Sequence, residues 1–319
     1  AGSSQLTDSG LGSSRPERSV RPRAVFKSAA LRIGWPAPSP DGAALVFSGH
    51  DGKRWSLYRL KVGGSTPEPL TVGLKGHATR PNYSHDGRKV AFRVSKRVRR
   101  APGAVWVLDL ETRRARPLHT QNEGAWDAYP EWFADGRRVL VTRKRTETQS
   151  HDLVVLGDGN SVQVITSSPH YDGKPTLSPD GRWAVFPSNR AGMISLWQVD
   201  IAAGEPSVKQ LTRQEARAPD WSPDGRWIAF QSKRAGEYDI YLLNVEERCV
   251  RRVTRGLNAT HPEWSADGRW LVFTAGGSKG TLQRIDIATW IKALDPKRGH
   301  HCKKLAPMAR PRTEPAKAP

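Results

Sequence analysis

One short phrase occurs six times along this chain: an acid–glycine pair, a polar or small residue, and then an alternating apolar run. The copies occupy residues 39–47, 84–92, 133–141, 178–186, 222–230 and 265–273, so successive copies begin 45, 49, 45, 44 and 43 residues apart. A period of about 40–45 residues is the length of one four-stranded propeller blade. The spacing therefore predicts an all-β protein, a six-bladed β-propeller with four antiparallel strands in each blade.

Each repeat contains four stretches with the composition of β-strands. The first ends just before the Asp-Gly pair, which forms a tight hairpin because Gly accepts a positive φ and Asp hydrogen-bonds its own backbone. The second is the apolar run of the phrase, as in residues 227–230. The third carries an apolar–aromatic pair such as Leu57-Tyr58, and the fourth ends in an apolar residue followed by Thr, as in Leu70-Thr71.

The sixth repeat lacks a fourth strand of this kind. Upstream of the first Asp-Gly pair, however, residues 23–27 read RAVFK, at the distance that separates a fourth strand from the next turn in the other repeats. A ring of blades must join its ends or leave strand edges exposed. We therefore predict that the N-terminal strand pairs into the last blade and closes the ring.

The recurring phrase also carries a family resemblance. The pattern S-P-D-G-[RK]-x-[IV]-A-F, the S-x-R-x-G loops at 188–192 and 232–236 and the Leu-Thr strand ending resemble the propeller repeats of the TolB type, relatives of WD repeats, over roughly residues 20–290. Propellers of this type serve as periplasmic assembly proteins, as gating domains of serine peptidases and as sugar-lyase scaffolds. The resemblance thus implies the fold, and function must be argued from the site.

Three segments are expected. Residues 1–20, rich in Ser, Gly and Arg, read as a disordered arm, residues 21–290 as the propeller, and residues 291–319 as a basic, Pro-rich tail. The chain is similar to a stand-alone propeller without the N-terminal domain of TolB. A start at Ala1 fits a product exported to a bacterial periplasm or cell surface after signal-peptide removal, and equally a trimmed chain.

Net charge bears on the partner. The chain has 51 Lys and Arg against 31 Asp and Glu, a formal charge of +20, which attracts anionic partners. Dispersed charges that only keep the ring in solution are the alternative. Clustering favours a basic patch on the loops between second and third strands, made by Lys96, Arg97, Arg99 and Arg100 in the second repeat and Arg143, Lys144 and Arg145 in the third.

An acidic protein surface is the partner that this patch favours, and an acidic glycan is the alternative. Nucleic acid is not a predicted partner, because most Trp residues fall in strand register and form no exposed stacking platform. No apolar stretch approaches the ~20 residues needed to cross a bilayer, so no transmembrane segment is expected.

A Pro stands three places before each phrase, and the residues upstream of it differ from repeat to repeat. They lie in the connections between blades and are predicted to line the channel mouth as a contact surface. The alternative is that they only hydrate a water-filled mouth. The candidates are Arg32, Trp35, His77, Arg80, Trp126, Asp127, Tyr129, Tyr171, Asp172, Lys174, Arg217 and His261.

Catalysis at this mouth is the alternative hypothesis. Asp127 and Asp172 occupy the same register in adjacent repeats, and paired carboxylates can share a proton or hold a cation. His77 and His261 could ligate a metal, as channel histidines do in the propeller-type lyases that the chain resembles. The sequence has no G-x-S-x-G, phosphate-binding glycine loop or H-E-x-x-H motif. We therefore predict a non-catalytic binding scaffold without cofactor or metal, with a lyase or hydrolase acting on an acidic saccharide as the alternative.

The two cysteines, Cys249 in the fourth strand of the fifth repeat and Cys302 in the tail, are candidates for a disulfide if the chain is exported. Two unrelated thiols are the alternative.

Overall fold

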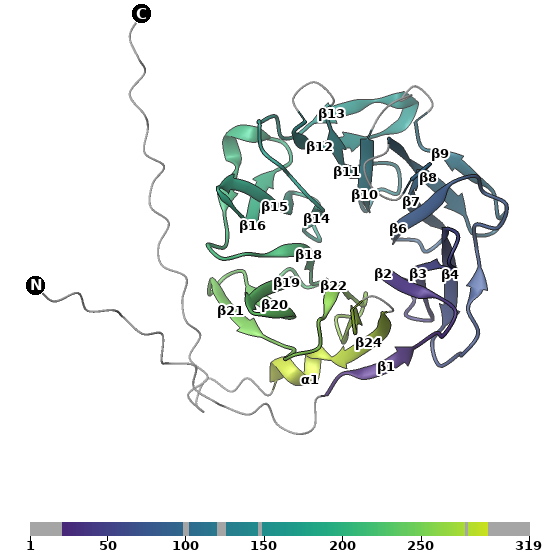
Figure 1. Ribbon diagram of the computed structural model, residues 1–319. Coiled ribbons are helices and arrows are strands. Elements are labelled where there is room, and N and C mark those ends of the chain that lie inside the picture. Colours follow the sequence, from purple (N-terminus) through teal and green to yellow (C-terminus); the bar gives the residue numbers. More distant parts are fainter. Residues whose placement is uncertain (1–20, 98–101, 120–125, 146–148, 278–279, 293–319) are drawn as a thin grey trace, which may run out of the picture.

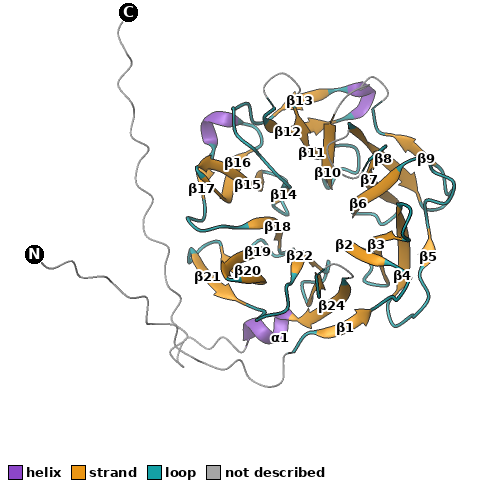
Figure 2. Cartoon of the chain, viewed as in Figure 1, coloured by secondary structure: helices purple, strands orange, loops and turns teal. Residues whose placement is uncertain are grey.

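The computed structural model describes residues 21–97, 102–119, 126–145, 149–277 and 280–292. Its sheets stand around a central opening, and the chain passes from one to the next in sequence order (Figures 1 and 2). The predicted β-propeller fold is confirmed. The first strand of each repeat, as the labels β2, β6, β10, β14, β18 and β22 in Figure 1 show, lies next to the opening.

The described strands form four sheets of four strands and one sheet of eight. The eight-stranded sheet contains two consecutive repeats, because Trp126 of one lies parallel to Gly103 of the other. In the first two repeats the strands are β2 (Arg32–Pro38), β3 (Ala44–His50), β4 (Trp55–Lys61), β5 (Glu68–Pro69), β6 (His77–Tyr83), β7 (Lys89–Ser95), β8 (Gly103–Asp109) and β9 (Ala115–Pro117). The third and fourth repeats contain β10 (Trp126–Trp132), β11 (Val139–Lys144), β12 (His151–Leu156), β13 (Val162–Val164), β14 (Thr176–Leu177), β15 (Trp183–Ala191), β16 (Met193–Asp200) and β17 (Lys209–Gln210). The last two contain β18 (Arg217–Trp221), β19 (Trp227–Ala235), β20 (Glu237–Asn244), β21 (Cys249–Arg252), β22 (Thr260–Trp264), β23 (Trp270–Ala275) and β24 (Thr281–Asp286).

The Asp-Gly phrase forms the predicted hairpin between first and second strands. In the first repeat Ser39 Oγ donates to Asp41 Oδ1 at 2.5 Å, and the Ala44 amide donates back to Ser39 Oγ at 2.9 Å. The phrase glycines have φ between 64° and 74°, a region that L side chains avoid. Hydrogen bonds from Ser39 and the Ala43 amide also lower the pKa of Asp41, which keeps the carboxylate ionised inside its turn.

The apolar–Thr pairs lie just beyond the short fourth strands and extend their hydrogen bonding. Thr71 Oγ1 accepts from the Leu57 amide at 3.0 Å, and Thr212 Oγ1 accepts from the Leu196 amide at 2.9 Å. A hydroxyl can thus replace a backbone carbonyl where the ladder ends. This role explains why Thr recurs at this position.

The core lies between neighbouring sheets. The Phe that ends the phrase is fully buried in five repeats, as Phe47 and Phe92 illustrate, and Val141 takes this place in the third. One cluster packs Val46 and Leu57 of the first repeat against Phe92 of the second. Burying such a side chain contributes roughly 1.5–3 kcal/mol. Each sheet is therefore held mainly by its two neighbours.

The ring closes as predicted. Strand β1 (Arg23–Phe26) pairs antiparallel with β24, with Phe26 opposite Leu282, and becomes the outer strand of the last sheet. The Phe26 ring lies 5.6 Å from the ring of Phe47 in the first repeat. The N-terminal strand thus contacts both ends of the ring.

A helix that was not predicted follows β24. Helix α1 (Ile287–Lys292) buries Ile287 and Trp290 in the core of the last two repeats. The helix continues past residue 290, where the propeller was predicted to end. Among the described residues no helix has the length and apolar character needed to span a membrane. The predicted arm at 1–20 lies outside the described residues, as does the predicted tail from residue 293 onward.

We expect Phe26→Ala to lower the free energy of unfolding by about 2 kcal/mol, because it removes a half-buried ring from the closing seam. Chemical denaturation followed by tryptophan fluorescence measures the loss. The control is Val164→Ala, on the outer strand β13, whose side chain is 55% exposed. Equal effects of the two variants would contradict a closing role for β1.

Candidate functional site

The channel is shaped by a bulge at the X-Pro step of the inner strands. In β2, β6, β10, β18 and β22 the strand register shifts by one residue across this step. The residue before Pro then has a positive φ of 47–58° in these strands; these residues are Trp35, Arg80, Tyr129, Ala218 and His261. A left-handed conformation costs roughly 1–2 kcal/mol for a residue other than Gly. The bulge interrupts the regular alternation of the strand. Side chains of residues before and after the Pro then contact residues of neighbouring sheets.

The residues before Pro form an aromatic and cationic layer. The Arg80 guanidinium carbon lies 4.4 Å from the Tyr129 ring centroid and 5.1 Å from that of Trp35. Trp35 in turn contacts His261, with ring centroids 5.5 Å apart. The charge of Arg80, more than the burial that opposes it, lowers the pKa of Tyr129. Four predicted mouth residues from four different repeats therefore meet here.

A second, acidic layer surrounds Lys174. Its Nζ donates to Glu263 Oε1 at 2.6 Å and to the Pro219 carbonyl at 3.1 Å. Burial is the largest influence on Lys174 and opposes its charge, but Glu263, Asp220 and Glu131 outweigh it and raise its pKa. Burial raises the pKa of Asp220 and Glu263, and it raises that of Glu131 to about 8. Three carboxyl groups thus share one ammonium.

The residues after Pro also join neighbouring sheets. Asn82 Oδ1 accepts from the Trp132 amide at 3.2 Å, Thr176 Oγ1 from the Trp221 amide at 3.1 Å, and Asp220 Oδ2 from the Trp264 amide at 2.6 Å. Each bond connects one repeat to the next at the channel wall. The channel polar groups therefore hold the ring as well as line it.

We expect Thr176→Val to destabilise the fold by about 1–2 kcal/mol, because the part-buried Trp221 amide loses its acceptor. The matched control is Thr274→Val. The Thr274 hydroxyl is also buried, but it has no hydrogen-bond partner among the described residues, so its replacement is expected to be neutral or stabilising. Thermal unfolding of both variants measures the difference, and the reverse order would contradict the role of Thr176.

The hypothesised carboxylate pair does not form. Asp127 is buried and accepts two hydrogen bonds of 2.8 Å from Arg143 on the adjacent strand. Asp172 is equally buried and accepts a 2.7 Å bond from Arg190. Each carboxylate is neutralised within its own repeat, so the two do not share a proton.

We expect a double-mutant cycle on this pair to show strong coupling. Asp127→Asn alone leaves the half-buried Arg143 without its counter-charge and is expected to cost about 2 kcal/mol of stability. Adding Arg143→Met removes that uncompensated charge, so the double variant is expected to lose about 1–3 kcal/mol less than the sum of the singles. Urea denaturation measures the four stabilities, and additive losses would contradict a structural pair.

The two channel histidines differ in their contacts. His77 Nδ1 accepts from the Trp55 amide at 3.2 Å, whereas His261 is held by its backbone amide, which donates to Gln231 Oε1 at 2.8 Å, and its ring Nδ1 is buried without a hydrogen-bond partner among the described residues. Burial, with help from Lys174 and Arg80, lowers the pKa of His261 to about 3, so its ring is neutral at physiological pH. Among the described residues no group of three His, Cys, Asp or Glu side chains has the geometry to hold a metal.

The predicted basic patch is partly neutralised. Arg143 pairs with Asp127, and Arg145 lies 2.5 Å from Asp152. Lys144 lies over the Trp126 ring at 4.3 Å, beside the start of β8. Lys96 and Arg97 are exposed, and Arg99 and Arg100 lie outside the described residues.

The remaining predicted contact residues lie around the mouth. Arg217 pairs with Glu215 at 2.8 Å, the Tyr171 ring packs against His151 at 4.9 Å, and Arg32 is exposed at the start of β2.

Cys249 is buried and disulfide-bonded. Cys302 lies outside the described residues, so the pairing of the two stays a prediction.

The acidic residues of the channel were missed at the sequence level. Glu131, Asp220 and Glu263 each stand directly after the recurring Pro, where the first repeat has Ala37. A charged residue inside a strand between Pro and an aromatic is a detectable signal. What the repeat alone does not show is that the ring brings Glu131, Asp220 and Glu263 together around Lys174.

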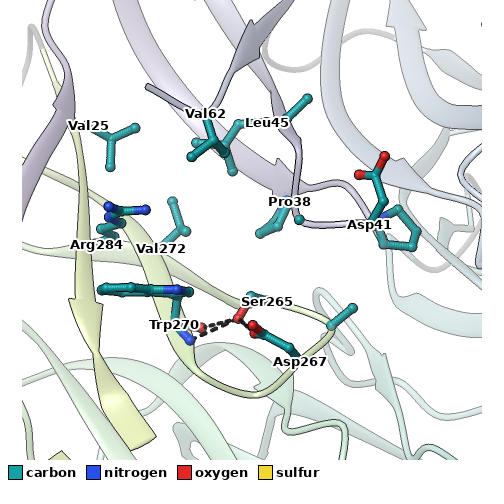
Figure 3. Close-up of a pocket in the computed structure, with 14 residues that line it drawn as sticks. Val25, Pro38, Asp41, Leu45, Val62, Ser265, Asp267, Trp270, Val272 and Arg284 are labelled. Carbon is teal, nitrogen blue, oxygen red and sulfur yellow. Dashed lines mark hydrogen bonds between the residues drawn. The ribbon is translucent and has the colours of Figure 1, made fainter. Parts of the chain in front are cut away.

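A separate cavity of about 270 Å³ lies beside the closing seam (Figure 3). Its walls are apolar, with Val25, Leu45 and Val272 around the Trp270 ring, and Arg284 stacks on that ring at 4.2 Å. Its carboxylate Asp267 accepts from Ser265 within the turn. Asp41 and Asp267, the two carboxylates of this cavity, therefore serve their own Asp-Gly turns.

A family model, the TolB beta propeller domain, matches residues 19–204, more than half of the chain. The chain belongs to the TolB β-propeller family. An uncharacterised protein of Agrobacterium fabrum is 27% identical over 208 residues, which cover 61% of this chain and 66% of that protein. The Tol-Pal system protein TolB of Bordetella pertussis is 27% identical over 155 residues, 48% of this chain and 34% of that protein.

Solved structures agree on the fold of this TolB-family propeller. The structure of a putative TolB from Agrobacterium tumefaciens has a TM-score of 0.66 and 22% identity, and the match covers 84% of this chain and 99% of that one. Similar proteins also include, by their names, a peptidase and an oligogalacturonate lyase. The chain spans less than two thirds of the length of the curated relatives, and the likeness to solved structures establishes the fold alone.

Proposed function

We propose that this protein is a non-catalytic binding scaffold of a bacterial envelope assembly, and that it binds an acidic protein partner at the channel mouth on the face of the inter-repeat connections. The observation that carries the proposal is the layer in which Trp35, Arg80, Tyr129 and His261 contact one another. Trp, Tyr and Arg are the residues that dominate binding energy at protein interfaces. Here they are held by strained backbone and differ between repeats.

The loops beside this mouth supply the charge that an acidic partner requires. Lys96 and Arg97 are exposed, and Lys144 stacks on Trp126 next to the strand that follows the 96–102 loop. The ion pairs of Arg143 and Arg145 are internal, so these two residues support the loop and leave the lysines to contact the partner. Long-range attraction from a chain of charge +20 would accelerate encounter.

Export and architecture complete the proposal. Curated relatives carry the name Tol-Pal system protein, and the TolB-type resemblance implies a periplasmic location for this chain as well.

We also propose six blades, with the eight-stranded sheet counted as two, because β6–β9 and β10–β13 connect through the single pair of Trp126 and Gly103. A disulfide between Cys249 and Cys302 is consistent with export.

We expect Lys96→Ser/Arg97→Ser/Lys144→Ser to weaken binding of the partner, recovered from an envelope extract and purified, by about tenfold and to flatten its salt dependence. The matched control Lys61→Ser/Arg88→Ser/Arg137→Ser removes the same charge from exposed residues at the Asp-Gly turn side. Calorimetric titration at two ionic strengths measures both. Equal losses in the two variants would show attraction by net charge alone and would reject the proposed surface.

A further inference from the structure

The opposite mouth of the channel, on the side of the Asp-Gly turns, holds a cavity that the proposed function does not use. Its volume is about 300 Å³, within the range of ligand sites. The second residues of five phrases line it, among them Ala134, Pro179, Pro223 and Ala266, all exposed. Apart from His85, the opening is thus ringed by small apolar side chains.

The walls and floor of this cavity differ in chemistry from its rim. Trp132, Leu177 and Trp221 form part of the wall, and Glu131 and Thr176 also line the cavity. Trp132 is 3% exposed, and its indole N–H has no hydrogen-bond partner among the described residues. Aromatic faces attract an organic cation through the ring quadrupole, and a carboxyl group does so through its charge once it is ionised.

The charge around the cavity floor favours a cation further. Glu131 accepts a hydrogen bond from Asn82 Nδ2 at 2.9 Å, which is a neutral donor. The one ammonium of the layer, Lys174, is bonded to Glu263. Glu131 and Asp220 therefore share the charge of Lys174 with Glu263, and neither has an ion pair of its own among the described residues.

Basic side chains near the rim do not cancel this preference. Arg226 pairs with Asp224 at 2.8 Å, and Arg182 lies 3.1 Å from Asp200. These arginines are neutralised by acidic groups of their own repeats. These two rim arginines therefore bring no uncompensated positive charge to the cavity.

We propose that this cavity binds the lysine side chain of a polypeptide partner, whose ammonium meets Glu131 while its alkyl chain passes between Trp132 and Trp221. The apolar rim of turn residues suits the backbone of an extended segment better than it suits a free, fully hydrated amine. This site is separate from the channel mouth on the face of the inter-repeat connections. It does not depend on the function proposed for that mouth.

Several groups set the pH dependence of binding. Burial is the main cause that raises the pKa of Glu131; Asp220 raises it further and Lys174 lowers it, and Glu263 belongs to the same layer. Arg80 and Arg93 act on Tyr129, two positions earlier on β10, and His85 lies on the rim. Because the pKa of Glu131 is raised to about 8, the carboxyl is mostly protonated at pH 6 and ionised at pH 9. A lysine ammonium stays charged throughout, so affinity is expected to rise with pH over this range.

The test uses the full chain and the peptide Ac-Gly-Lys-Gly-NH2, followed by NMR of the tryptophan indole N–H signals. We expect saturable millimolar binding that strengthens at least tenfold from pH 6 to pH 9 and falls at least tenfold in Glu131→Gln. The control Glu237→Gln removes the same charge from an exposed position at the start of β20 and is expected to change affinity less than twofold. If Glu131→Gln fails to fold, Ala134→Arg, which places a cation on the exposed rim, is expected to abolish binding.

Three results would overturn the proposal. The first is absence of saturable binding by the wild-type chain, and the second is equal binding of the same peptide with norleucine in place of lysine. The third is equal loss in Glu131→Gln and Glu237→Gln. n-Butylammonium tests the source of the cation: weaker binding than the peptide supports a polypeptide partner, and equal or tighter binding rejects it. If the lysine site is rejected, the proposed binding of an acidic partner at the connection side is unaffected, because the two sites lie at opposite ends of the channel.

Discussion

A ring of sheets is stable only when its first and last members pack against each other, and here a strand of four residues reinforces the direct core contact of Leu45 and Phe47 with Val272 and Leu282. Strand β1 pairs with β24 of the last repeat, while its Phe26 contacts Phe47 of the first. Every other interface is made by consecutive repeats and follows from chain order. The seam is different because it joins segments more than 250 residues apart, so its loop-closure entropy must be offset by pairing and packing.

Once the ring is closed, the X-Pro bulges decide what the channel contains. The extra residue in each bulged strand interrupts the regular alternation of side chains. The residues before the Pro and the residues after it both contact other repeats. One side builds the layer of Trp35, Arg80, Tyr129 and His261, and the other supplies Glu131, Asp220 and Glu263. The strain of five left-handed residues persists because neighbouring sheets hold them in place.

The two ends of the channel therefore differ chemically. The connection side combines aromatic rings, Arg80 and the exposed Lys96 and Arg97, which suits an acidic partner. The turn side combines an apolar rim with buried carboxyl groups, which suits a cation. A scaffold that engages two surfaces of opposite charge would need this asymmetry, and the net charge of the chain gives no indication of it.

The repeat period, the Asp-Gly turns, the Thr endings and the closing strand were all readable from the sequence, because each depends on local backbone chemistry or on counting residues between turns. The partners of the channel residues were not. Without the bulge, counting back from the turn at Asp135 would place Asp127 opposite Lys144, whereas the shifted register places it opposite Arg143. The bulge residues are not glycines, so nothing local marks them as left-handed. Likewise, Lys174 meets Glu263 across 89 residues because the ring brings the fourth and sixth repeats to one axis, and only the closed tertiary structure sets that distance.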